Sequence, residues 1–276
     1  MSKLLQKPEK QEVAEGVTII QSVTKGNSPL EYVEFKIVEL AHGAEYSELL
    51  IRKECCIVAL TGKINVTVGE DVYRDLGTRE SVFDKVPTDS IYVSNDRDFG
   101  LEAITEARVA LCYSPSDKQL PTKWIKAEDV DVEHRGILSN KRMVHNILPD
   151  SAPYANSLLV VEVYTESGNW SSYPPHKHDR DNLPNESLLE ESYYHEMNPS
   201  QGFVFQRVYT DDRSIDETMS VENGDVVLVP AGYHPVGVPD GYESYYLNVM
   251  AGPARTWKFH NDPDHEWILN RRKRSC

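Results

Sequence analysis

Short runs of hydrophobic or alternating residues recur along the whole chain. Glycine, proline, asparagine and aspartate separate these runs, and no segment shows the sustained periodicity of a long amphipathic helix. Many short strands divided by turn residues are typical of a β-sandwich or a β-barrel. The pattern therefore predicts an all-β protein, with strands near residues 31–40, 54–68, 90–94, 101–114, 158–165, 191–197, 202–210, 225–230 and 242–252.

The two halves of the chain repeat one weak pattern. Glu54 and Glu191 each precede a glycine and a strand-like run, and VFDKVP (82–87) parallels DVVLVP (225–230). Such internal similarity predicts two copies of one β-barrel unit. The polar segment 116–142 is the expected linker between them. We therefore expect two domains, an N-terminal barrel over residues 1–125 and a C-terminal barrel over residues 126–276.

Charge limits the classes of partner. The 276 residues include 29 lysines and arginines against 44 acidic residues, a net charge of −15. Nucleic-acid binding usually needs a basic patch, and the only basic run is RRKR at 271–274, so we expect no nucleic-acid partner. A few local arginines can still bind a small acid on an acidic protein, so a small anionic substrate remains compatible with this charge.

Cysteines and the N-terminus indicate the compartment. The spacing of the four cysteines suggests neither a disulfide framework nor a cysteine zinc site. The first sixteen residues lack the apolar core of a signal peptide, and no run approaches the length of a membrane span. We expect a cytoplasmic protein without a membrane partner. The cysteines are Cys55, Cys56, Cys112 and Cys276.

A set of histidines and carboxylates in the second half predicts a metal site. His176 and His178 are separated by one residue, so in a strand both imidazoles point the same way. Glu190 and Glu191 follow, and His234 lies further on in GDVVLVPAGYHP (224–235). Three imidazoles and one carboxylate suit a divalent ion and leave positions open for substrate. We expect zinc first, with manganese, iron or nickel as alternatives.

The order of these residues resembles the two motifs of the cupin superfamily, whose members are double-stranded β-helix (jelly-roll) barrels with a metal inside. Two departures stand out. Residues 179–189 lengthen the gap between His178 and the carboxylates, and we interpret them as a loop at the barrel mouth. His234 follows Pro230 by four residues, where five is more usual. The first half lacks a full ligand set, so the resemblance implies a bicupin whose C-terminal barrel alone binds metal.

Most of the chain resembles the bicupin family of 5-deoxy-glucuronate isomerase and, more remotely, the 4-deoxy-L-threo-5-hexosulose-uronate ketol-isomerase of pectin breakdown. The resemblance implies a metal-dependent aldose–ketose isomerase of myo-inositol catabolism, which converts 5-deoxy-D-glucuronate to 5-dehydro-2-deoxy-D-gluconate. The segments that carry it are SSYPPHKHD (171–179), LEESYYH (189–195), QGFVFQRVYTDDRSIDE (201–217), GDVVLVPAGYHPV (224–236), YYLNVMAGPARTW (245–257) and NDPDHEWI (261–268).

The cupin pattern also favours one carboxylate. Glu190 and Glu191 point to opposite faces of a strand, so only one can bind the ion. The cupin ligand glutamate comes immediately before a sequence like Ser-Tyr-Tyr, which favours Glu191. Tyr193 and His195 then also face the barrel interior. We expect His176, His178, Glu191 and His234 to be both metal ligands and catalytic residues.

Other polar residues are candidates for binding substrate. Tyr246 and Asn248 share the strand face that should line the barrel, and Gln206 lies on the opposite face to Arg207. Arg213 is a candidate for a bidentate clamp on the substrate carboxylate, with Arg207 as the alternative. We expect Gln206, Arg213, Tyr246 and Asn248 to contact the deoxy-uronic acid.

Several questions remain open at the level of sequence. Metal-bound hydroxide, Glu190, His195 or a tyrosine could each carry the proton. The chain could instead be the pectin-pathway isomerase, a cupin dioxygenase or a non-catalytic sugar-acid binder. Open barrel edges favour a homo-oligomer of undetermined number.

Overall fold

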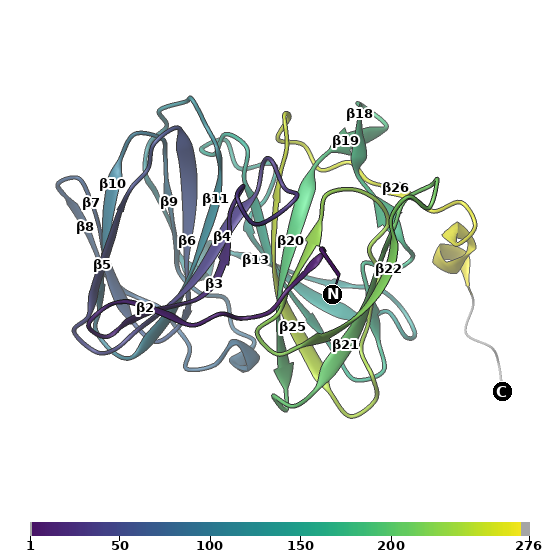
Figure 1. The fold of residues 1–276 in the computed structure, drawn as a ribbon, viewed down its shortest axis with the longest axis horizontal. Coiled ribbons are helices and arrows are strands. Elements are labelled where there is room, and N and C mark those ends of the chain that lie inside the picture. Colours follow the sequence, from purple (N-terminus) through teal and green to yellow (C-terminus); the bar gives the residue numbers. More distant parts are fainter. Residues whose placement is uncertain (1, 272–276) are drawn as a thin grey trace.

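The computed structural model describes residues 2–271, and its N-terminal half forms a barrel of two facing sheets (Figure 1). The first sheet contains, in spatial order, β12 (Lys123–Ile125), β9 (Ser90–Val93), β6 (Lys53–Thr61), β11 (Ala107–Pro115), β4 (Glu34–Leu40), β3 (Val17–Val23) and β2 (Gln11–Ala14). The second sheet contains β5 (Glu45–Leu49), β10 (Asp98–Ala103), β7 (Ile64–Val68) and β8 (Asp71–Leu76).

The C-terminal half repeats this arrangement beside the first barrel (Figure 1). Its larger sheet contains β1 (Leu5–Gln6), β23 (Val226–Val229), β20 (Glu190–Asn198), β25 (Glu243–Ala251), β15 (Leu159–Thr165), β14 (Arg142–Leu148) and β13 (Asp131–Arg135). Its smaller sheet contains β16 (Trp170–Ser171), β24 (Val236–Gly237), β21 (Phe203–Tyr209) and β22 (Asp216–Glu222). Two short pairs complete it, β17 (His176–Lys177) with β26 (His260–Asn261) and β18 (Asp179–Asn182) with β19 (Glu186–Leu188).

The described helices are short 3₁₀ turns, so the all-β prediction is confirmed. They are η1 (Val82–Asp84), η2 (Ala127–Asp129) and η3 (Glu266–Asn270). The strands pair antiparallel throughout, as hairpins and longer connections between short strands allow.

Alternation along the strands creates three cores. In β25, Tyr246 and Met250 face the interior of the C-terminal barrel, whereas Tyr245, Leu247 and Val249 face the N-terminal barrel. The N-terminal barrel encloses its own apolar interior. The seven-stranded sheets of the two barrels thus pack against each other, and the metal-site candidates lie in the C-terminal interior, remote from that contact.

Polar groups also cross the contact between barrels. Arg79 of the N-terminal barrel forms a buried ion pair with Glu162 of β15, and it donates a hydrogen bond to the Tyr164 hydroxyl at 2.8 Å. His145 Nδ1 lies 3.2 Å from the same carboxylate. In addition, β1 leaves the N-terminal half and pairs with β23. The two barrels are therefore joined by apolar packing, by one exchanged strand and by buried ion pairs.

The segment 116–142, expected to link the two halves, itself contributes a strand to each barrel. This segment contains β12, which pairs with β9 of the N-terminal barrel, and β13, which pairs with β14 of the C-terminal barrel. Both are short edge strands, and their polar residues suit an exposed edge. A domain boundary near residue 126 stays our proposal, and β1 is then the part of the N-terminal domain that joins the other barrel.

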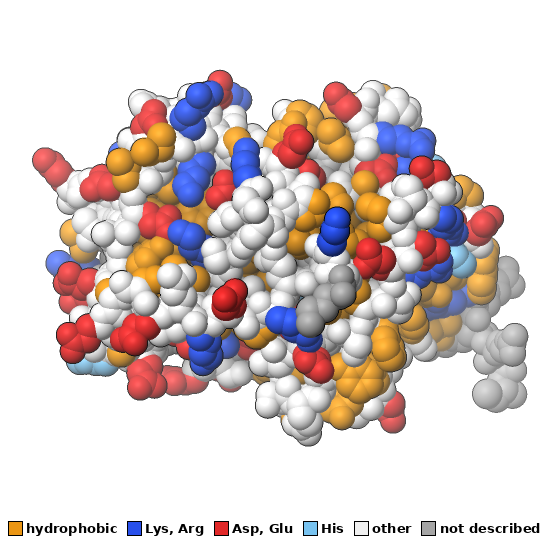
Figure 2. Space-filling view, viewed as in Figure 1, with side chains coloured by type: hydrophobic (Ala, Val, Ile, Leu, Met, Phe, Trp, Pro, Cys, Tyr) orange, Lys and Arg blue, Asp and Glu red, His pale blue; other side chains and the backbone are white. Residues whose placement is uncertain are grey.

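The surface carries charges of both signs. On the face shown in Figure 2, lysine and arginine side chains are interspersed with acidic ones. Among the described residues, no helix has the length and apolar character needed to cross a membrane. Cys55, Cys56 and Cys112 are buried and unbridged. Residues 272–274 of the basic run and Cys276 lie outside the described part of the chain.

Candidate metal centre and substrate pocket

The carboxylates of Glu190 and Glu191 lie on opposite faces of strand β20. Glu191 and Tyr193 line a pocket inside the C-terminal barrel, and buried His195 follows on the same face. Glu190 instead faces the N-terminal barrel, where its carboxylate accepts hydrogen bonds from the backbone N–H groups of Glu31 at 2.8 Å and Tyr32 at 2.7 Å. These bonds hold Glu190 away from the pocket, so it is not positioned to carry a proton there.

The three histidines converge from two segments. His176 lies in β17, which pairs with β26, and His178 follows it directly. His234 lies in the turn between β23 and β24. The ring centroid of His234 lies 5.1 Å from that of His176 and 5.3 Å from that of His178. The pairing of His176 with Asn261 shows that the C-terminal segment supports the first histidine.

Backbone carbonyls orient two of these rings. Nδ1 of His178 lies 2.9 Å from the Leu189 carbonyl oxygen, and Nδ1 of His234 lies 2.8 Å from that of Gly232. A carbonyl oxygen can only accept, so each Nδ1 carries the proton and each Nε2 keeps its lone pair. This arrangement is typical of metal-binding histidines.

The candidate ligand atoms of two histidines and one glutamate lie close together. Ligand atoms of His178, Glu191 and His234 all lie within 4.8 Å of one another. His178 Nε2 is 2.5 Å from Glu191 Oε1, and His234 Nε2 is 3.5 Å from Glu191 Oε2. Within the described residues, His234 Nε2 is buried without a hydrogen-bond partner, which is costly unless another group satisfies it. The residues thus fit a divalent ion. His176 is adjacent but outside this set of three, and its role as a ligand stays a prediction.

Electrostatics favours the metal-binding form of Glu191, His176 and His234, whereas His178 is biased toward its protonated form. Burial raises the pKa of Glu191, but His234 and His178 outweigh it and hold that pKa well below its usual range. Burial lowers the pKa of His176 and of His234, so both rings are neutral. Burial also lowers the pKa of His178, but Glu191 outweighs it and raises that pKa above its ordinary value. A divalent ion requires an ionised carboxylate and neutral imidazoles, so metal binding would displace the proton that Glu191 favours on His178.

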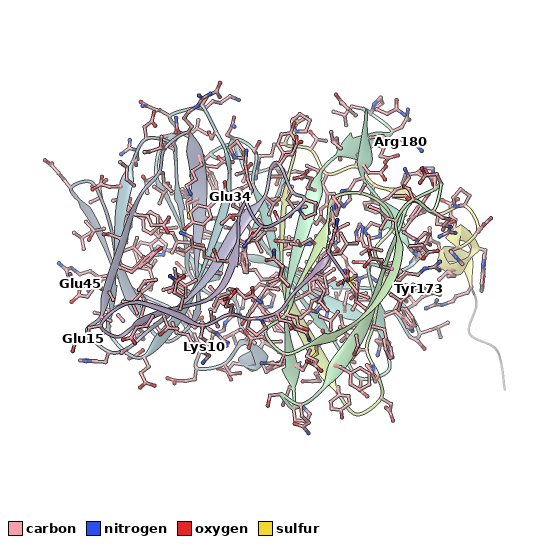
Figure 3. The ribbon with its side chains drawn as sticks, viewed as in Figure 1. Lys10, Glu15, Glu34, Glu45, Tyr173 and Arg180 are labelled. Carbon is pink, nitrogen blue, oxygen red and sulfur yellow. The ribbon has the colours of Figure 1, made fainter. Side chains whose placement is uncertain are left out.

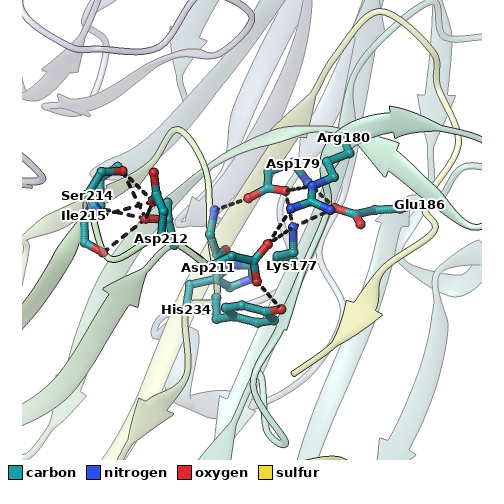
Figure 4. A network of polar contacts seen from close by, with 12 residues as sticks. Lys177, Asp179, Arg180, Glu186, Asp211, Asp212, Ser214, Ile215 and His234 are labelled. Atoms are coloured by element: carbon teal, nitrogen blue, oxygen red, sulfur yellow. Dashed lines mark hydrogen bonds and ion pairs between the residues drawn. The ribbon is translucent and has the colours of Figure 1, made fainter. Parts of the chain in front are cut away.

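A buried lysine fixes the loop around the site (Figure 4). Lys177 points away from the pocket, and its ammonium lies 2.6 Å from Asp179 and 3.1 Å from Asp211. Asp179 also accepts a hydrogen bond from the N–H of Gly232 at 2.9 Å, two residues before His234. This network therefore connects the segment that carries His176 and His178 to the turn that carries His234.

The pocket beside the candidate metal ligands has one cationic side. His176, Glu191, Tyr193, Tyr246 and Asn248 line it near the candidate metal position, and Asn248 donates a hydrogen bond to Glu191 Oε2 at 3.0 Å. The remaining lining residues include two arginines and an indole that sequence reasoning missed. They are Arg135, Arg142, Val144, Val161, Val163, Ser172 and Trp257.

The structure places the other predicted site residues differently. Gln206 is fully buried, lies 3.0 Å from His195 Nε2 and is not among the residues that line this pocket. Arg213 is half exposed, with its guanidinium 4.3 Å from the ring centre of Tyr209 and outside the pocket lining. Arg207 pairs with Asp216 at the surface. The structure therefore brings Tyr246 and Asn248 together with the metal ligands, and leaves Gln206 and Arg213 outside their pocket.

The residues between His178 and the carboxylates form the hairpin β18–β19, which carries Arg180 at the upper edge of the C-terminal barrel (Figure 3). The N–H of Asp179 donates to Glu186 Oε1 at 2.9 Å, which holds the base of the hairpin together. None of these residues is among those that line the pocket. The hairpin contacts the segment that follows Trp257, because the N–H of Ser187 donates a hydrogen bond to the Lys258 carbonyl oxygen at 2.9 Å.

Comparison with known proteins agrees with this geometry. Residues 4–268 match the model of the KduI/IolB family. The chain belongs to the KduI/IolB family. A 5-deoxy-glucuronate isomerase from Bacillus licheniformis is 73% identical over 98% of this chain and 100% of its own length. One from Bacillus subtilis (strain 168) is 71% identical with the same coverage.

Solved structures support the fold. An IolB-like protein from Salmonella typhimurium has a TM-score of 0.92 and 44% identity, covering 96% of this chain and 99% of its own. An oxalate decarboxylase from Bacillus subtilis has a TM-score of 0.68 at 14% identity, covering 95% of this chain and 80% of its own, so it bears on the fold alone. The predicted bicupin architecture is confirmed.

Proposed function

We propose that this member of the KduI/IolB family is an aldose–ketose isomerase that converts 5-deoxy-D-glucuronate to 5-dehydro-2-deoxy-D-gluconate. The observation that carries the proposal is the set of His178, Glu191 and His234 at a pocket that also contains two arginines. A metal-facing end and a cationic end suit a substrate with a carbonyl at one end and a carboxylate at the other. Relatives that bear the name 5-deoxy-glucuronate isomerase, at 65% to 73% identity, support the same choice.

The cofactor in this proposal is a divalent ion, with zinc expected first and manganese, iron or nickel as alternatives. His176, His178, Glu191 and His234 would hold it. When bound, the ion supplies Lewis-acid polarisation of the substrate oxygens. In the described chain, the buried Nε2 atom of His234 has no hydrogen-bond partner and that of His178 contacts only Glu191, which supports the assignment of both.

The reaction moves a proton from C2 to C1, and negative charge develops on the oxygens of both carbons. Tyr193 and Tyr246 line the pocket, and burial raises the pKa of each phenol. Each therefore keeps its proton and can donate a hydrogen bond to a developing oxyanion. His195 is fully buried and lies outside the pocket lining, and burial lowers its pKa to about 4, so it stays neutral. Its place is to hold Gln206 within the barrel wall.

A wider groove elsewhere is a poorer candidate. It runs past Glu39, Glu80 and Glu106, and its one arginine, Arg108, is already paired with Glu196. Its acidic lining would repel a sugar acid. The interior of the C-terminal barrel is therefore the proposed site.

An isomerase assay on purified protein with 5-deoxy-D-glucuronate tests the proposal. NMR in D₂O would follow the C2 proton in protein as purified, after chelation and after addition of single metals. We expect turnover that chelation abolishes and one metal restores, and we expect His234→Ala to lose metal and turnover while the surface variant His42→Ala keeps both. Full turnover by chelated protein would contradict the proposed role of the metal. Faster turnover of the pectin-derived uronate would contradict the proposal that 5-deoxy-D-glucuronate is the substrate.

The proposal also includes a reducing cytoplasm and a homo-oligomer. Three buried, unbridged cysteines are compatible with such a compartment. Light scattering coupled to size exclusion would give the number of subunits directly.

A further inference from the structure

We propose that Arg142, together with Arg135, binds the carboxylate of the sugar acid and so determines which end of the substrate faces the metal ligands. This inference rests on the proposed function for the identity of the substrate. The two arginines belong to β13 and β14 and line the same pocket as His176 and Glu191.

The two guanidinium groups come from directly opposite positions. Arg135 and Arg142 are cross-strand partners in the β13–β14 pair. Like charges at such positions destabilise a sheet unless an anion lies near them. Glu133 offsets this cost at Arg135 only, and an anionic ligand between the two guanidinium groups would reduce it further.

Arg142 has no acidic partner in the part of the chain that the structure describes. It is half-buried, and its only protein hydrogen bond there goes to the Asn140 carbonyl oxygen at 2.9 Å. Burial lowers its pKa, and the charge of Arg135 acts in the same direction. The more deeply buried Arg79 is by contrast neutralised by Glu162. An unpaired cation beside a pocket is a feature of ligand sites.

Arg135 is only partly neutralised. Glu133 accepts a hydrogen bond from its Nε at 2.6 Å, which leaves the two terminal nitrogens without a described protein partner. The guanidinium lies 5.5 Å from the ring centre of Trp257, which also lines the pocket. The indole and Glu133 restrict the side chain, so its planar fork is ready for bidentate recognition of a carboxylate.

Local backbone geometry holds Arg142 in place. Gly136 has a φ of +89°, and a Cβ there would lie 1.8 Å from the Asn140 carbonyl oxygen and 3.1 Å from Arg142 Nη1. Only glycine allows this carbonyl to approach and accept from the guanidinium. The turn between β13 and β14 thus positions the carbonyl oxygen that holds the Arg142 guanidinium.

The size of the pocket places the carboxylate at the arginines. The cavity beside the metal ligands has only about 40 Å³. The same two arginines line a second cavity of about 230 Å³, which Lys85, Lys141, His134 and Glu166 also line. A six-carbon acid with its reacting end at the candidate metal ligands would therefore reach the arginines. Lysines and arginines outnumber Glu166 in this second cavity, so it would attract an anion from solution.

Kinetics of Arg142→Met test this assignment, with Arg74→Met on the exposed face of the N-terminal barrel as the matched control. We expect kcat/KM for 5-deoxy-D-glucuronate to fall about 10- to 100-fold, mostly through KM, with unchanged metal content. For 5-deoxy-D-glucose, which has a hydroxymethyl group in place of the carboxylate, the variant and wild type should differ little. An equal loss on both substrates would overturn the assignment, as would a larger effect of Arg213→Met.

Binding without turnover separates this inference from the proposed function. D-gluconate has a carboxylate but no aldehyde, and its binding to chelated protein can be followed by ligand NMR, with neutral D-glucitol as reference. We expect wild type to bind gluconate better than glucitol and Arg142→Met to lose that preference. This result would stand even if 5-deoxy-D-glucuronate were not the substrate, whereas an unchanged preference in the variant would refute the clamp.

Discussion

Glu54 and Glu190 perform the same task in opposite barrels. Glu54 accepts hydrogen bonds from the N–H groups of Ser157 at 2.6 Å and Leu158 at 2.8 Å, immediately before β15. Glu190 accepts from Glu31 and Tyr32, shortly before β4. Each carboxylate thus accepts hydrogen bonds from backbone N–H groups in the turn that precedes a strand of the other barrel.

This symmetry corrects the repeat as read from the sequence. Aligning Glu54 with Glu191 is wrong by one residue, because the equivalent of Glu54 is Glu190. The position equivalent to Glu191 is then Cys55, which is buried in the N-terminal interior. Burial raises the pKa of its thiol, so this position holds a neutral side chain where the C-terminal barrel has a carboxylate.

Substitution of each of the two neighbouring glutamates should therefore have a different effect, on stability for Glu190 and on metal binding for Glu191. Glu190→Ala would leave two backbone N–H groups without their acceptor at the contact between barrels, and we expect it to lower the free energy of unfolding by about 2–4 kcal/mol. Glu191→Ala should instead abolish metal binding. Urea unfolding and metal analysis on both variants make the comparison, and metal loss in Glu190→Ala with retention in Glu191→Ala would reverse the assignment.

The Arg79–Glu162 pair gives a second prediction. Both side chains are fully buried, so removal of one partner leaves an unpaired charge between the barrels. We expect Arg79→Met to cost about 3–5 kcal/mol of unfolding free energy. The double variant with Glu162→Leu should recover much of that loss, since no charge remains. A double variant as unstable as the single one would show that the pair itself stabilises the contact.

Acid should weaken the same contact. Burial raises the pKa of Glu162, but Arg79 and His145 outweigh it and lower that pKa to about 2. A folded-state pKa below the unfolded value gives stability that is present above about pH 4.5 and lost as pH falls toward 2. We expect the unfolding free energy of wild type to fall across this window more steeply than that of the Arg79→Met, Glu162→Leu double variant. Parallel slopes in urea titrations at several pH values would argue against this coupling.

Metal should stabilise the folded protein. An ion that binds only the native state raises the melting temperature with concentration. We expect added zinc to raise the melting temperature of chelated wild type and of His42→Ala, and to leave that of His234→Ala unchanged. Differential scanning calorimetry would measure the shift, and an equal shift in His234→Ala would place the bound zinc elsewhere.

The strand pattern, the order of the candidate ligands and the inward face of β20 could be predicted from the sequence, because each depends on local alternation. Sequence reasoning missed Arg135 and Arg142 because both lie within 116–142, the polar segment that was interpreted as a linker. The alternation in DVDVEHR (129–135) was the available signal. Arg213 was a plausible clamp by residue type, but its location depends on how β21 and β22 turn, which no local spacing determines.

Gly232 provides the last prediction, because its carbonyl oxygen accepts a hydrogen bond from the candidate metal ligand His234. It has a φ of +94°, and a Cβ would lie 2.4 Å from the Tyr209 carbonyl oxygen. Gly232→Ala must therefore shift the turn whose carbonyl oxygen accepts from His234 Nδ1. We expect about 10-fold or greater loss of metal affinity, the usual scale for disrupted support of a ligand histidine. Gly241→Ala is the matched control, since its φ of +89° carries the same strain but nothing lies within 4 Å of its added Cβ. Competition with a chromogenic chelator measures the metal affinity. Equal affinities of the two variants would show that the turn at Gly232 does not support metal binding.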